Sequence, residues 1–460
     1  MSVLYSEEFK PFSSGLKNYW GSLYGSSEAL ALIEFAESQK QVVLYIAKDI
    51  THYDEVRKAL NFFNTSLEIL DFSSWEVLAF DHFSPHPDIV SSRLETLSKL
   101  PSLKSGIVIT TLETLSQRLC PKNYIEIYSL HLKTKQNLEI KSFSENLIKI
   151  GYRRVTTVME QGEFCIKGAL IDLYPMGTKN PYRIDLFDNE IDSIRSFDTS
   201  SQRSIEIIKE IKLLPAREFA TDSDSISIFK DNYLSEFGNT DGFIYNEVSE
   251  GRYPGGIEFY LPLFFKTTET LFDYILGEPV IFYQKGLNEA MELQAKELLE
   301  RFEYCKGSLE RLPLEINKVF LNTERFFKKL SDKKQVQIQS SKIEKEEGYN
   351  FSSSILPPLK IEAQTKKPLN KLIKFIENFD GQVLIVCESE GRQSVLTDLL
   401  STHQLKVNDC SHWSDFHSQN NGLCITNASL SEGVLFEKIA IITENNGLFY
   451  INCCRKKDYR

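Results

Sequence analysis

Residues 160–219 read EQGEFCIKGALIDLYPMGTKNPYRIDLFDNEIDSIRSFDTSSQRSIEIIKEIKLLPAREF, and this stretch decides the fold of its region. Apolar and polar residues alternate along it in short runs, with the period of β-strands. The runs break at Pro175-Met176-Gly177 and at Asn180-Pro181, where proline fixes φ and removes a backbone donor. The pattern predicts a small antiparallel sheet.

The most informative part of this stretch is residues 182–197. In a strand over its first six residues, side chains alternate between two faces. The apolar face holds Ile184 and Leu186, and the charged face holds Arg183, Asp185 and Phe187. Asp188-Asn189 suits a two-residue turn, because both residue types tolerate positive φ.

The return strand over residues 190–197 places Arg195 and Phe197 on a common side. A sheet face that carries arginines beside exposed phenylalanines suits a protein partner, because these residues dominate binding energy at interfaces. The pattern leaves a plainer interpretation open. Cross-strand Arg/Asp pairs on a solvated face, with the phenylalanines covered by a neighbouring segment, would give the same sequence.

The same stretch resembles a known family. The runs GEFCIKGALIDLYP, YRIDLFDNEIDSIRSFD, SQRS and LLPAREF, in this order, are similar to the second domain of the bacterial transcription-repair coupling factors (Mfd). That domain is in turn similar to the UvrA-binding domain of the excision-repair protein UvrB. The resemblance extends to DHFSPHPDIV at 81–90, to GIEFY at 256–260 and, more weakly, to ESEGR at 388–392, and we take it to cover residues 1 to about 445.

The resemblance implies a set of partner-binding residues. Lys167, Arg183 and Phe187 fall on family positions that contact UvrA, and Arg195 is expected to add charge-assisted hydrogen bonds beside Arg183. The family more often has arginine at the position of Lys167, and lysine cannot reproduce the bidentate fork of a guanidinium. No catalytic residue, cofactor or metal ligand is expected.

Bulk composition narrows the possible function. The 460 residues carry 53 basic and 64 acidic side chains, a net charge of −11, which does not give the overall positive field of a dedicated nucleic-acid-binding protein. The eight cysteines are scattered, so reduced thiols are expected. The start of the chain is acidic where a secretory signal would be basic, and no apolar run is long enough to cross a membrane. A cytoplasmic monomer is expected.

The first 127 residues alternate helix and strand signals, which predicts a doubly wound parallel sheet. Such sheets often bind nucleotides at a glycine loop, here residues 21–27, GSLYGSS. A phosphate loop needs the pattern G-x-x-x-x-G-K-[ST], and the chain contains no Gly-Lys dipeptide. UvrB carries a working ATP site in this domain and the coupling factors a degenerate one, so the resemblance implies that ATP and magnesium belong to the family's motor domains.

The expected fold class is α/β: a degenerate UvrB/RecA-like doubly wound domain with an inserted antiparallel α+β domain, followed by a small α/β domain. Residues 332–368 are rich in Lys, Glu, Ser and Pro and predict a solvated tether. The expected divisions are 1–127 (first domain, part a), 128–214 (UvrA-binding domain), 215–340 (first domain, part b), 341–368 (linker), 369–445 (small α/β domain) and 446–460 (divergent tail).

These observations predict a UvrA-recruiting module of a transcription-repair coupling factor, acting in nucleotide excision repair by binding. By resemblance, full-length members are ATP-dependent DNA translocases that remove stalled RNA polymerase; the polymerase-binding and motor domains are expected to be absent here through truncation. Two alternatives stay open. One is an ATP-dependent repair enzyme similar to UvrB, and the other is a non-functional truncated gene product.

Overall fold

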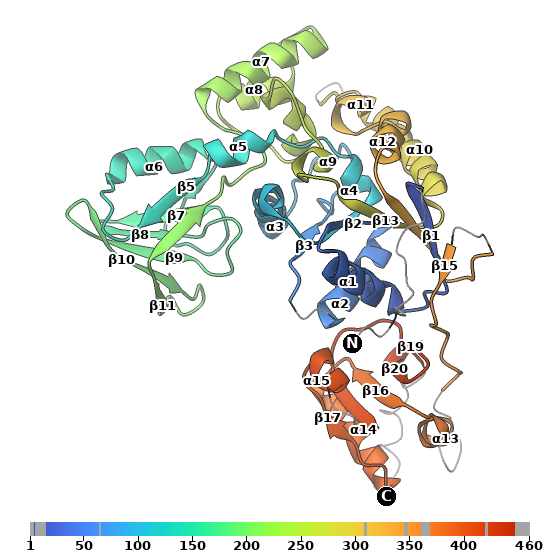
Figure 1. Ribbon diagram of the computed structural model, residues 1–460. Coiled ribbons are helices and arrows are strands. Elements are labelled where there is room, and N and C mark those ends of the chain that lie inside the picture. The colour runs from blue at the N-terminus through green and yellow to red at the C-terminus, as the bar shows by residue number, and fades with distance from the viewer. Residues whose placement is uncertain are drawn as a thin grey trace, which may run out of the picture.

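The computed structural model describes residue 4 and residues 15–63, 66–307, 311–344, 348–359, 369–418 and 422–446. The chain forms a central α/β body, an inserted β-rich lobe, a helical lobe and a separate C-terminal lobe (Figure 1). The expected tail after residue 446 lies outside the described residues. In the part of the chain that the structure describes, no helix is both long enough and apolar enough to cross a membrane.

The central body is a seven-stranded sheet in the order β15-β1-β14-β13-β2-β4-β3, with every pairing parallel. Its central strands are continuous apolar runs, as expected for strands covered on both faces. The strands are β1 (Lys17–Gly21), β2 (Val42–Ala47), β3 (Ile69–Phe72), β4 (Gly106–Thr111), β13 (Val280–Gln284), β14 (Gln335–Ile338) and β15 (Gly348–Asn350).

Helices cover both faces of this sheet, which confirms the doubly wound architecture. Tyr45 of β2 packs with the helices of one face, and Leu44 packs with those of the other, because neighbouring strand residues point to opposite sides. The first face is covered by α1 (Ser27–Gln39) and α2 (Ile50–Phe63). The second is covered by α3 (Pro87–Lys99), η1 (Leu100–Ser102), α4 (Leu112–Ser116), α10 (Leu287–Lys306) and α12 (Thr323–Ser331).

The predicted tether is wrong where the structure describes it. Strand β14 lies inside the sheet between β1 and β13, and β15 forms its edge beside β1. Phe351 is buried and its ring meets that of Trp20 edge-on, with the centroids 5.2 Å apart. Polar residues flank Val336 and Ile338, so the sequence does not read as a strand. Both apolar side chains nevertheless reach the core.

The inserted lobe contains a six-stranded sheet in the order β11-β10-β9-β8-β7-β6, antiparallel except between β6 and β7. This confirms the antiparallel sheet predicted from residues 160–219. Its strands are β6 (Arg153–Arg154), β7 (Glu163–Lys167), β8 (Leu170–Leu173), β9 (Tyr182–Phe187), β10 (Glu190–Phe197) and β11 (Ser204–Ile208). Beside it lie α5 (Lys122–Ile127), α6 (Ile140–Lys149) and a ribbon of β5 (Leu130–Lys133) and β12 (Glu210–Leu213).

The helical lobe has an aromatic core that joins it to the central body. Phe219 stacks on Phe264 with ring centroids 4.3 Å apart, and Trp75 meets Phe259 edge-on at 5.4 Å. Its elements are α7 (Ser223–Phe237), α8 (Phe243–Ser249), η2 (Ile257–Phe264), α9 (Leu271–Tyr274) and α11 (Ile316–Val319). Helix α7 begins after Asp222, whose side chain caps its N-terminus, and ends at Gly238, its C-cap.

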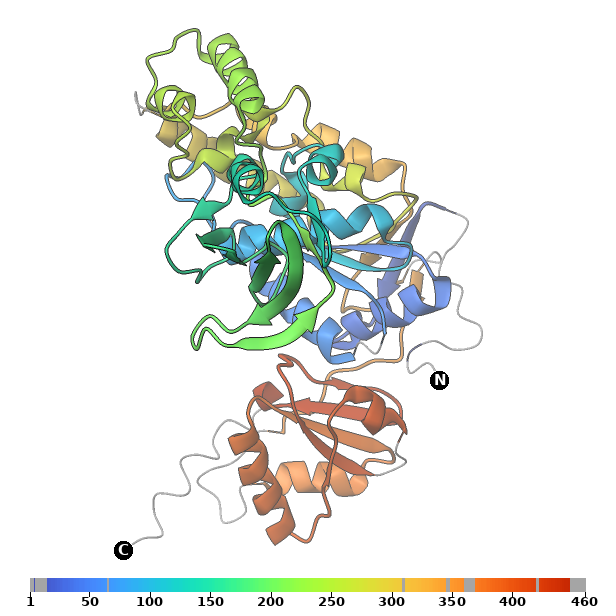
Figure 2. The ribbon, with the colours of Figure 1, turned by 90° about the vertical axis from the view of Figure 1, so that its left-hand side faces the viewer.

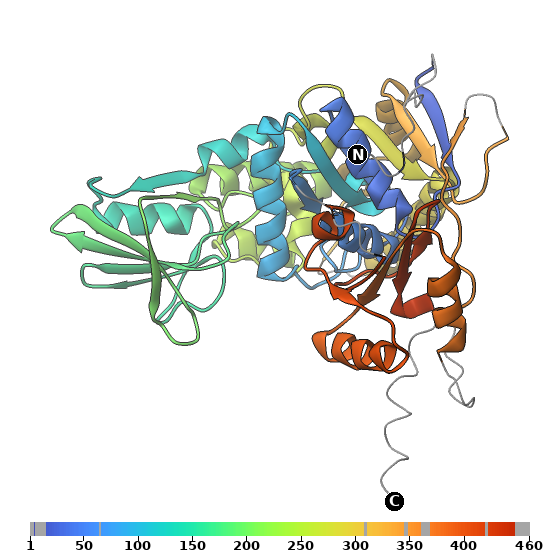
Figure 3. The same ribbon diagram turned by 60° about the horizontal axis from the view of Figure 1, so that its bottom comes forward.

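The C-terminal lobe is a five-stranded sheet in the order β17-β18-β16-β20-β19, parallel except for β19. The lobe lies against the first two helices of the body (Figures 2 and 3). The ring of Trp413 meets that of Phe63 in α2 edge-on, with the centroids 5.0 Å apart. Its elements are α13 (Asn370–Asn378), β16 (Gln382–Cys387), α14 (Glu390–Thr402), β17 (Asn408–Asp409), α15 (Trp413–Ser418), β18 (Leu423–Asn427), β19 (Val434–Leu435), β20 (Ile439–Thr443) and η3 (Glu444–Asn446).

Candidate functional site

The pairing register of the inserted sheet gathers the four candidate residues on one face. Asp172 lies opposite Arg183, and Arg183 lies opposite Arg195 on the next strand. Cys165 lies opposite Asp172, so Lys167, two residues further along β7, shares this face. Phe187, four residues after Arg183, shares it as well. We call this surface, with Lys167, Arg183, Phe187 and Arg195, the candidate face.

The opposite face of the sheet is part of the core. Ile184 and Leu186 are buried, and α6 packs over that side through Phe143 and Leu147. The predicted alternation along β9 is therefore confirmed: apolar side chains point inward and charged ones outward. The core side fixes the strand register, because a shift of one residue would turn every side chain to the wrong face.

Arg183 is held by its own sheet. Its Nε donates to Asp172 Oδ1 at 2.7 Å and its Nη2 to Asp172 Oδ2 at 3.0 Å. A third bond runs from Nη1 to the carbonyl oxygen of Gln202 at 3.2 Å. The hydrogen bonds to Asp172 raise the pKa of Arg183, and 21% of its side chain is exposed. The guanidinium thus has a fixed orientation, with one edge committed to Asp172.

Arg195 is the more accessible arginine. Its side chain is 39% exposed, and its Nη2 lies 3.3 Å from Asp185 Oδ2 and 3.0 Å from Ser193 Oγ. These contacts come from the open side of the sheet, where water competes with them. The cross-strand Arg/Asp pairs of the plainer interpretation are therefore present at both arginines. They do not cover the face.

Phe187 and Lys167 lie open on this face. Phe187 ends β9 with 75% of the residue exposed, next to a tight turn in which Asp188 has a φ of +55°. Lys167 is exposed at the end of β7. The predicted turn at Asp188-Asn189 is confirmed, because it joins β9 directly to β10. Phe187 is thus an aromatic side chain with most of its surface in water.

The expectation of exposed phenylalanines is wrong for Phe197. This ring is fully buried in a small cluster with Val158 and Cys165. The guanidinium carbon of Arg183 lies 4.7 Å from its centroid, in a cation–π arrangement. Residues from the loop before β7 cover it, as the plainer interpretation allowed. Phe197 therefore packs against the guanidinium of Arg183 and is not accessible to a partner.

Two exposed isoleucines that the sequence pattern does not single out lie beside the candidate face. Ile207 lies directly opposite Arg195 and is 78% exposed, and Ile205 is 58% exposed. They belong to β11, at the edge of the sheet. The signal was the alternating run SIEII at residues 204–208, but its alternation alone does not tell which isoleucines lack cover.

The glycine loop at residues 21–27 is occupied by the chain itself. The N–H of Ser22 donates to Ser341 O at 3.2 Å, and that of Tyr24 donates to Ser353 Oγ at 3.1 Å. Leu23 N–H donates to Gln339 O at 3.4 Å. A phosphate loop works by pointing free N–H groups at the ligand. Here three of these donors are already satisfied by protein.

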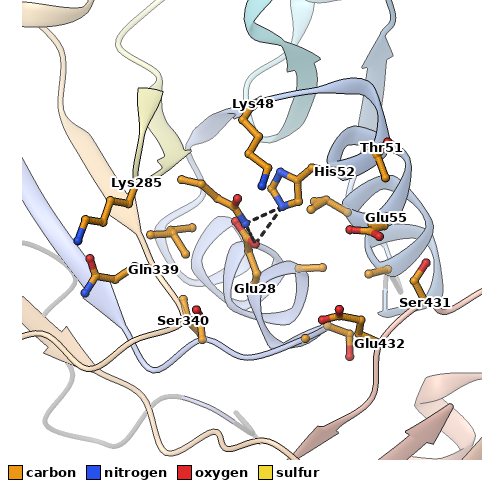
Figure 4. Close-up of a pocket in the computed structure, with 18 of the residues that line it drawn as sticks. Glu28, Lys48, Thr51, His52, Glu55, Lys285, Gln339, Ser340, Ser431 and Glu432 are labelled. Carbon is orange, nitrogen blue, oxygen red and sulfur yellow. Dashed lines mark hydrogen bonds and ion pairs between the residues drawn. The ribbon is translucent and has the colours of Figure 1, made fainter. Parts of the chain in front are cut away.

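A cavity of about 550 Å³ lies beside this loop, between the central body and the C-terminal lobe (Figure 4). At its centre the buried Glu28 carboxylate accepts from Tyr45 Oη at 2.5 Å and from Gln284 Nε2 at 2.9 Å, and lies 3.4 Å from His52 Nε2. Burial favours a raised pKa for Glu28. The hydrogen bond and the charge of His52 outweigh it, together with the hydrogen bonds from Tyr45 and Gln284, so the pKa is lowered overall. A carboxylate held in its charged form repels phosphate.

The described residues bring together no group of three His, Cys, Asp or Glu side chains with the geometry of a metal site. The cysteines at 120, 165, 305, 387, 410 and 424 are free thiols. Lys48 and Lys285 line the cavity beside Glu28, but the loop lacks the Gly-Lys pair that places a lysine on the phosphates of a nucleotide. The candidate face is the feature of the described chain with the clearest functional chemistry.

Comparison with known proteins matches two segments to family profiles. The UvrB interaction domain matches residues 130–219, which hold the candidate face, and the D3 domain of MFD matches residues 375–446, the C-terminal lobe. The first match includes Lys167, Arg183, Phe187 and Arg195.

Whole-chain relatives agree with these matches. The chain is 37% identical over 395 residues to the transcription-repair-coupling factor of Escherichia coli, covering 85% of this chain and 34% of that protein. It is 36% identical over 434 residues to the protein of the same name from Haemophilus influenzae, covering 93% and 38%. A relative from Rickettsia bellii is 33% identical over 292 residues, covering 63% and 25%. The chain thus spans about a third of the length of the curated relatives it matches.

Proposed function

Because this chain is homologous to the N-terminal, UvrB-like region of the transcription-repair coupling factors, we propose that it recruits the excision-repair protein UvrA. The inserted lobe is the docking platform, and the candidate face is the surface that meets UvrA. The work done by the site is binding, and no covalent step is required of it.

One observation carries this proposal. In the segment matched to the UvrB interaction domain, four side chains of partner-binding character share one face of a sheet whose other face is buried core. Exposed aromatic and arginine side chains are the residue types that supply most binding energy in protein interfaces. A rigid sheet presents them with little loss of conformational entropy on binding.

Each residue has a distinct role in the proposed contact. Phe187, exposed at the turn between β9 and β10, inserts as the apolar anchor. Arg195 offers a charge-assisted hydrogen bond to a partner carboxylate, for which it exchanges a solvent-exposed contact with Asp185. Lys167 supplies a point charge at the rim. Arg183, clamped by Asp172, presents its remaining N–H groups in a fixed direction.

The alternative of a UvrB-like, ATP-dependent enzyme is less well supported. The chain has no Gly-Lys dipeptide, the donors of the glycine loop are taken up by Ser341, Gln339 and Ser353, and Glu28 places negative charge in the adjoining cavity. The translocase activity and the RNA polymerase and DNA contacts of the full-length family stay outside this proposal, because the match covers about a third of those proteins.

The test is a binding measurement with purified UvrA immobilised on a biosensor. We expect Phe187→Ala to raise the dissociation constant by roughly tenfold or more, since truncating an interface anchor typically costs about 2 kcal/mol. Phe83→Ala is the matched control, because Phe83 is 70% exposed but lies outside the inserted lobe. Equal affinity of the two variants for UvrA would reject the proposal.

A further inference from the structure

The edge strand β11 is unusually apolar for an unpaired edge. Two of its five residues are isoleucines with 58% and 78% exposure, and the sheet order places β11 at the end of the sheet. Exposed edges in soluble proteins are normally blunted by charged or proline residues, because free N–H and C=O groups beside apolar side chains attract other chains. Such an edge indicates a surface that is covered in a complex.

The strand register joins this edge to the candidate face. Ile207 lies opposite Arg195, which lies opposite Arg183, so the three side chains form a row across three strands. Ile208 lies opposite Ile194 and packs on the core side. Ile207 therefore points to the same side as Arg195, away from the core, and extends the candidate face to the end of the sheet.

We propose that Ile207, with its neighbour Ile205, forms an apolar extension of the UvrA-docking surface. This inference rests on the proposed function and adds to it a second contact region, separate from the Phe187 anchor. The part of UvrA that it fits is an apolar strip with a carboxylate beside it, because Ile207 lies directly opposite the cationic Arg195.

A second copy of this chain fits the edge less well. If β11 paired antiparallel with itself over its full length, Glu206 would lie directly opposite Glu206 of the second copy. Like charges directly opposite one another in a sheet are destabilising. The sequence of the strand thus combines an apolar surface with a charge that opposes self-association, as a surface for a different protein would.

The experiment uses the full chain with purified UvrA and four variants: Ile207→Ser, Ile205→Ser, Phe187→Ala and Ile355→Ser. Ile355 is the matched control, because it is 71% exposed but lies far along the chain, after β15. We expect Ile207→Ser to raise the dissociation constant for UvrA by roughly fivefold or more, and Ile355→Ser to leave it unchanged. Ile205→Ser serves as a second, independent variant, with a smaller increase expected because Ile205 is less exposed.

The outcomes separate the two ideas. If UvrA binds the unmodified chain, and Phe187→Ala weakens binding while Ile207→Ser and Ile205→Ser do not, the extension is rejected and the proposed function stands. If UvrA does not bind the unmodified chain, both are rejected. Light scattering on the free chain tests the other occupant: a dimer that Ile207→Ser dissociates, with affinity for UvrA unchanged, would also reject the extension.

Discussion

The carboxylate of Asp172 accepts two parallel hydrogen bonds from the guanidinium of Arg183, at 2.7 and 3.0 Å. The two residues lie on neighbouring strands of the inserted sheet, and 4% of the Asp172 side chain is exposed against 21% of that of Arg183. This clamp is built before any partner arrives. It therefore gives the candidate face a fixed donor group, at no ordering cost during binding.

Loss of the clamp is expected to affect both stability and binding. Asp172→Ala removes the acceptor of two charge-assisted hydrogen bonds. Arg183 then keeps its hydrogen bond to the carbonyl oxygen of Gln202 and its cation–π contact with Phe197. We expect the free energy of unfolding to fall by about 1–3 kcal/mol, measured by urea denaturation. UvrA affinity should fall as well, but Phe187→Ala should weaken binding without changing stability. A variant that binds UvrA as tightly as the unmodified chain would show that the orientation of Arg183 is unimportant.

A fully buried ion pair fixes the chain where it leaves the inserted lobe. Arg93 Nε lies 2.6 Å from Glu218 Oε1, with 0% and 2% of the two side chains exposed, and Trp75 Nε1 also donates to Glu218. Glu218→Ala leaves Arg93 buried without its partner, so we expect a loss of about 3–5 kcal/mol in unfolding free energy. Lys99→Ala, which breaks the exposed pair with Glu95, is the control and should cost less than about 1 kcal/mol.

The glycine loop is expected to hold the C-terminal lobe in place. Gly25 has a φ of +50°, and a Cβ at this position would lie 2.3 Å from the carbonyl oxygen of Gly433. Gly25→Ala should therefore loosen the contact between the loop and the lobe, and hydrogen exchange should rise around Trp413. Gly391→Ala makes the same chemical change in open space and should leave exchange unaltered. Unchanged exchange in Gly25→Ala would mean that the loop does not anchor the lobe.

Acid should weaken the cluster around Glu28. Its pKa in the folded chain lies below the ordinary value of 4.5, so its charged form is favoured by folding. The stability that it contributes is therefore present above about pH 4.5 and is lost as the pH falls through the lowered folded pKa. We expect Glu28→Gln to be less stable than the unmodified chain at pH 7, with a difference that shrinks in acid. Urea denaturation between pH 7 and pH 3 measures this, and a constant difference would contradict it.

ATP is expected to leave the thermal stability of the chain unchanged. A ligand present at 100 times its dissociation constant adds about 2.7 kcal/mol to the stability of a folded protein. Because the donors of the glycine loop are satisfied by Ser341, Gln339 and Ser353, we expect no rise in melting temperature with ATP and magnesium at millimolar concentration. A clear rise would revive the enzyme alternative.

The inserted sheet was predictable because its pattern is local. In β9 the alternation of Ile184 and Leu186 with charged residues states both the strand and its buried side, and Asp188-Asn189 marks the turn. The apolar runs at residues 42–47 and 106–111 likewise indicate strands covered on both faces. These signals depend on neighbours in sequence, so no knowledge of the tertiary structure was needed.

The remaining features depend on contacts between distant residues. Phe197 is buried against Val158, and Ile207 is exposed because β11 is the last strand of its sheet. The local sequence pattern indicates neither fact. Val336 and Ile338 alternate with glutamines in a charged stretch, so the local pattern predicts a tether where the structure has a strand. Ser353 fills the glycine loop from more than 300 residues away. Burial by remote segments thus decides which predicted side chains are available to a partner.

The most direct test of the docking face is hydroxyl-radical footprinting of the intact chain with and without UvrA, read out by mass spectrometry at individual side chains. We expect UvrA to protect Phe187 from oxidation and to leave Phe83, which is almost equally exposed, unprotected. Equal oxidation of Phe187 in the free chain and in a demonstrated complex would reject the candidate face as the docking surface, because UvrA would then dock elsewhere.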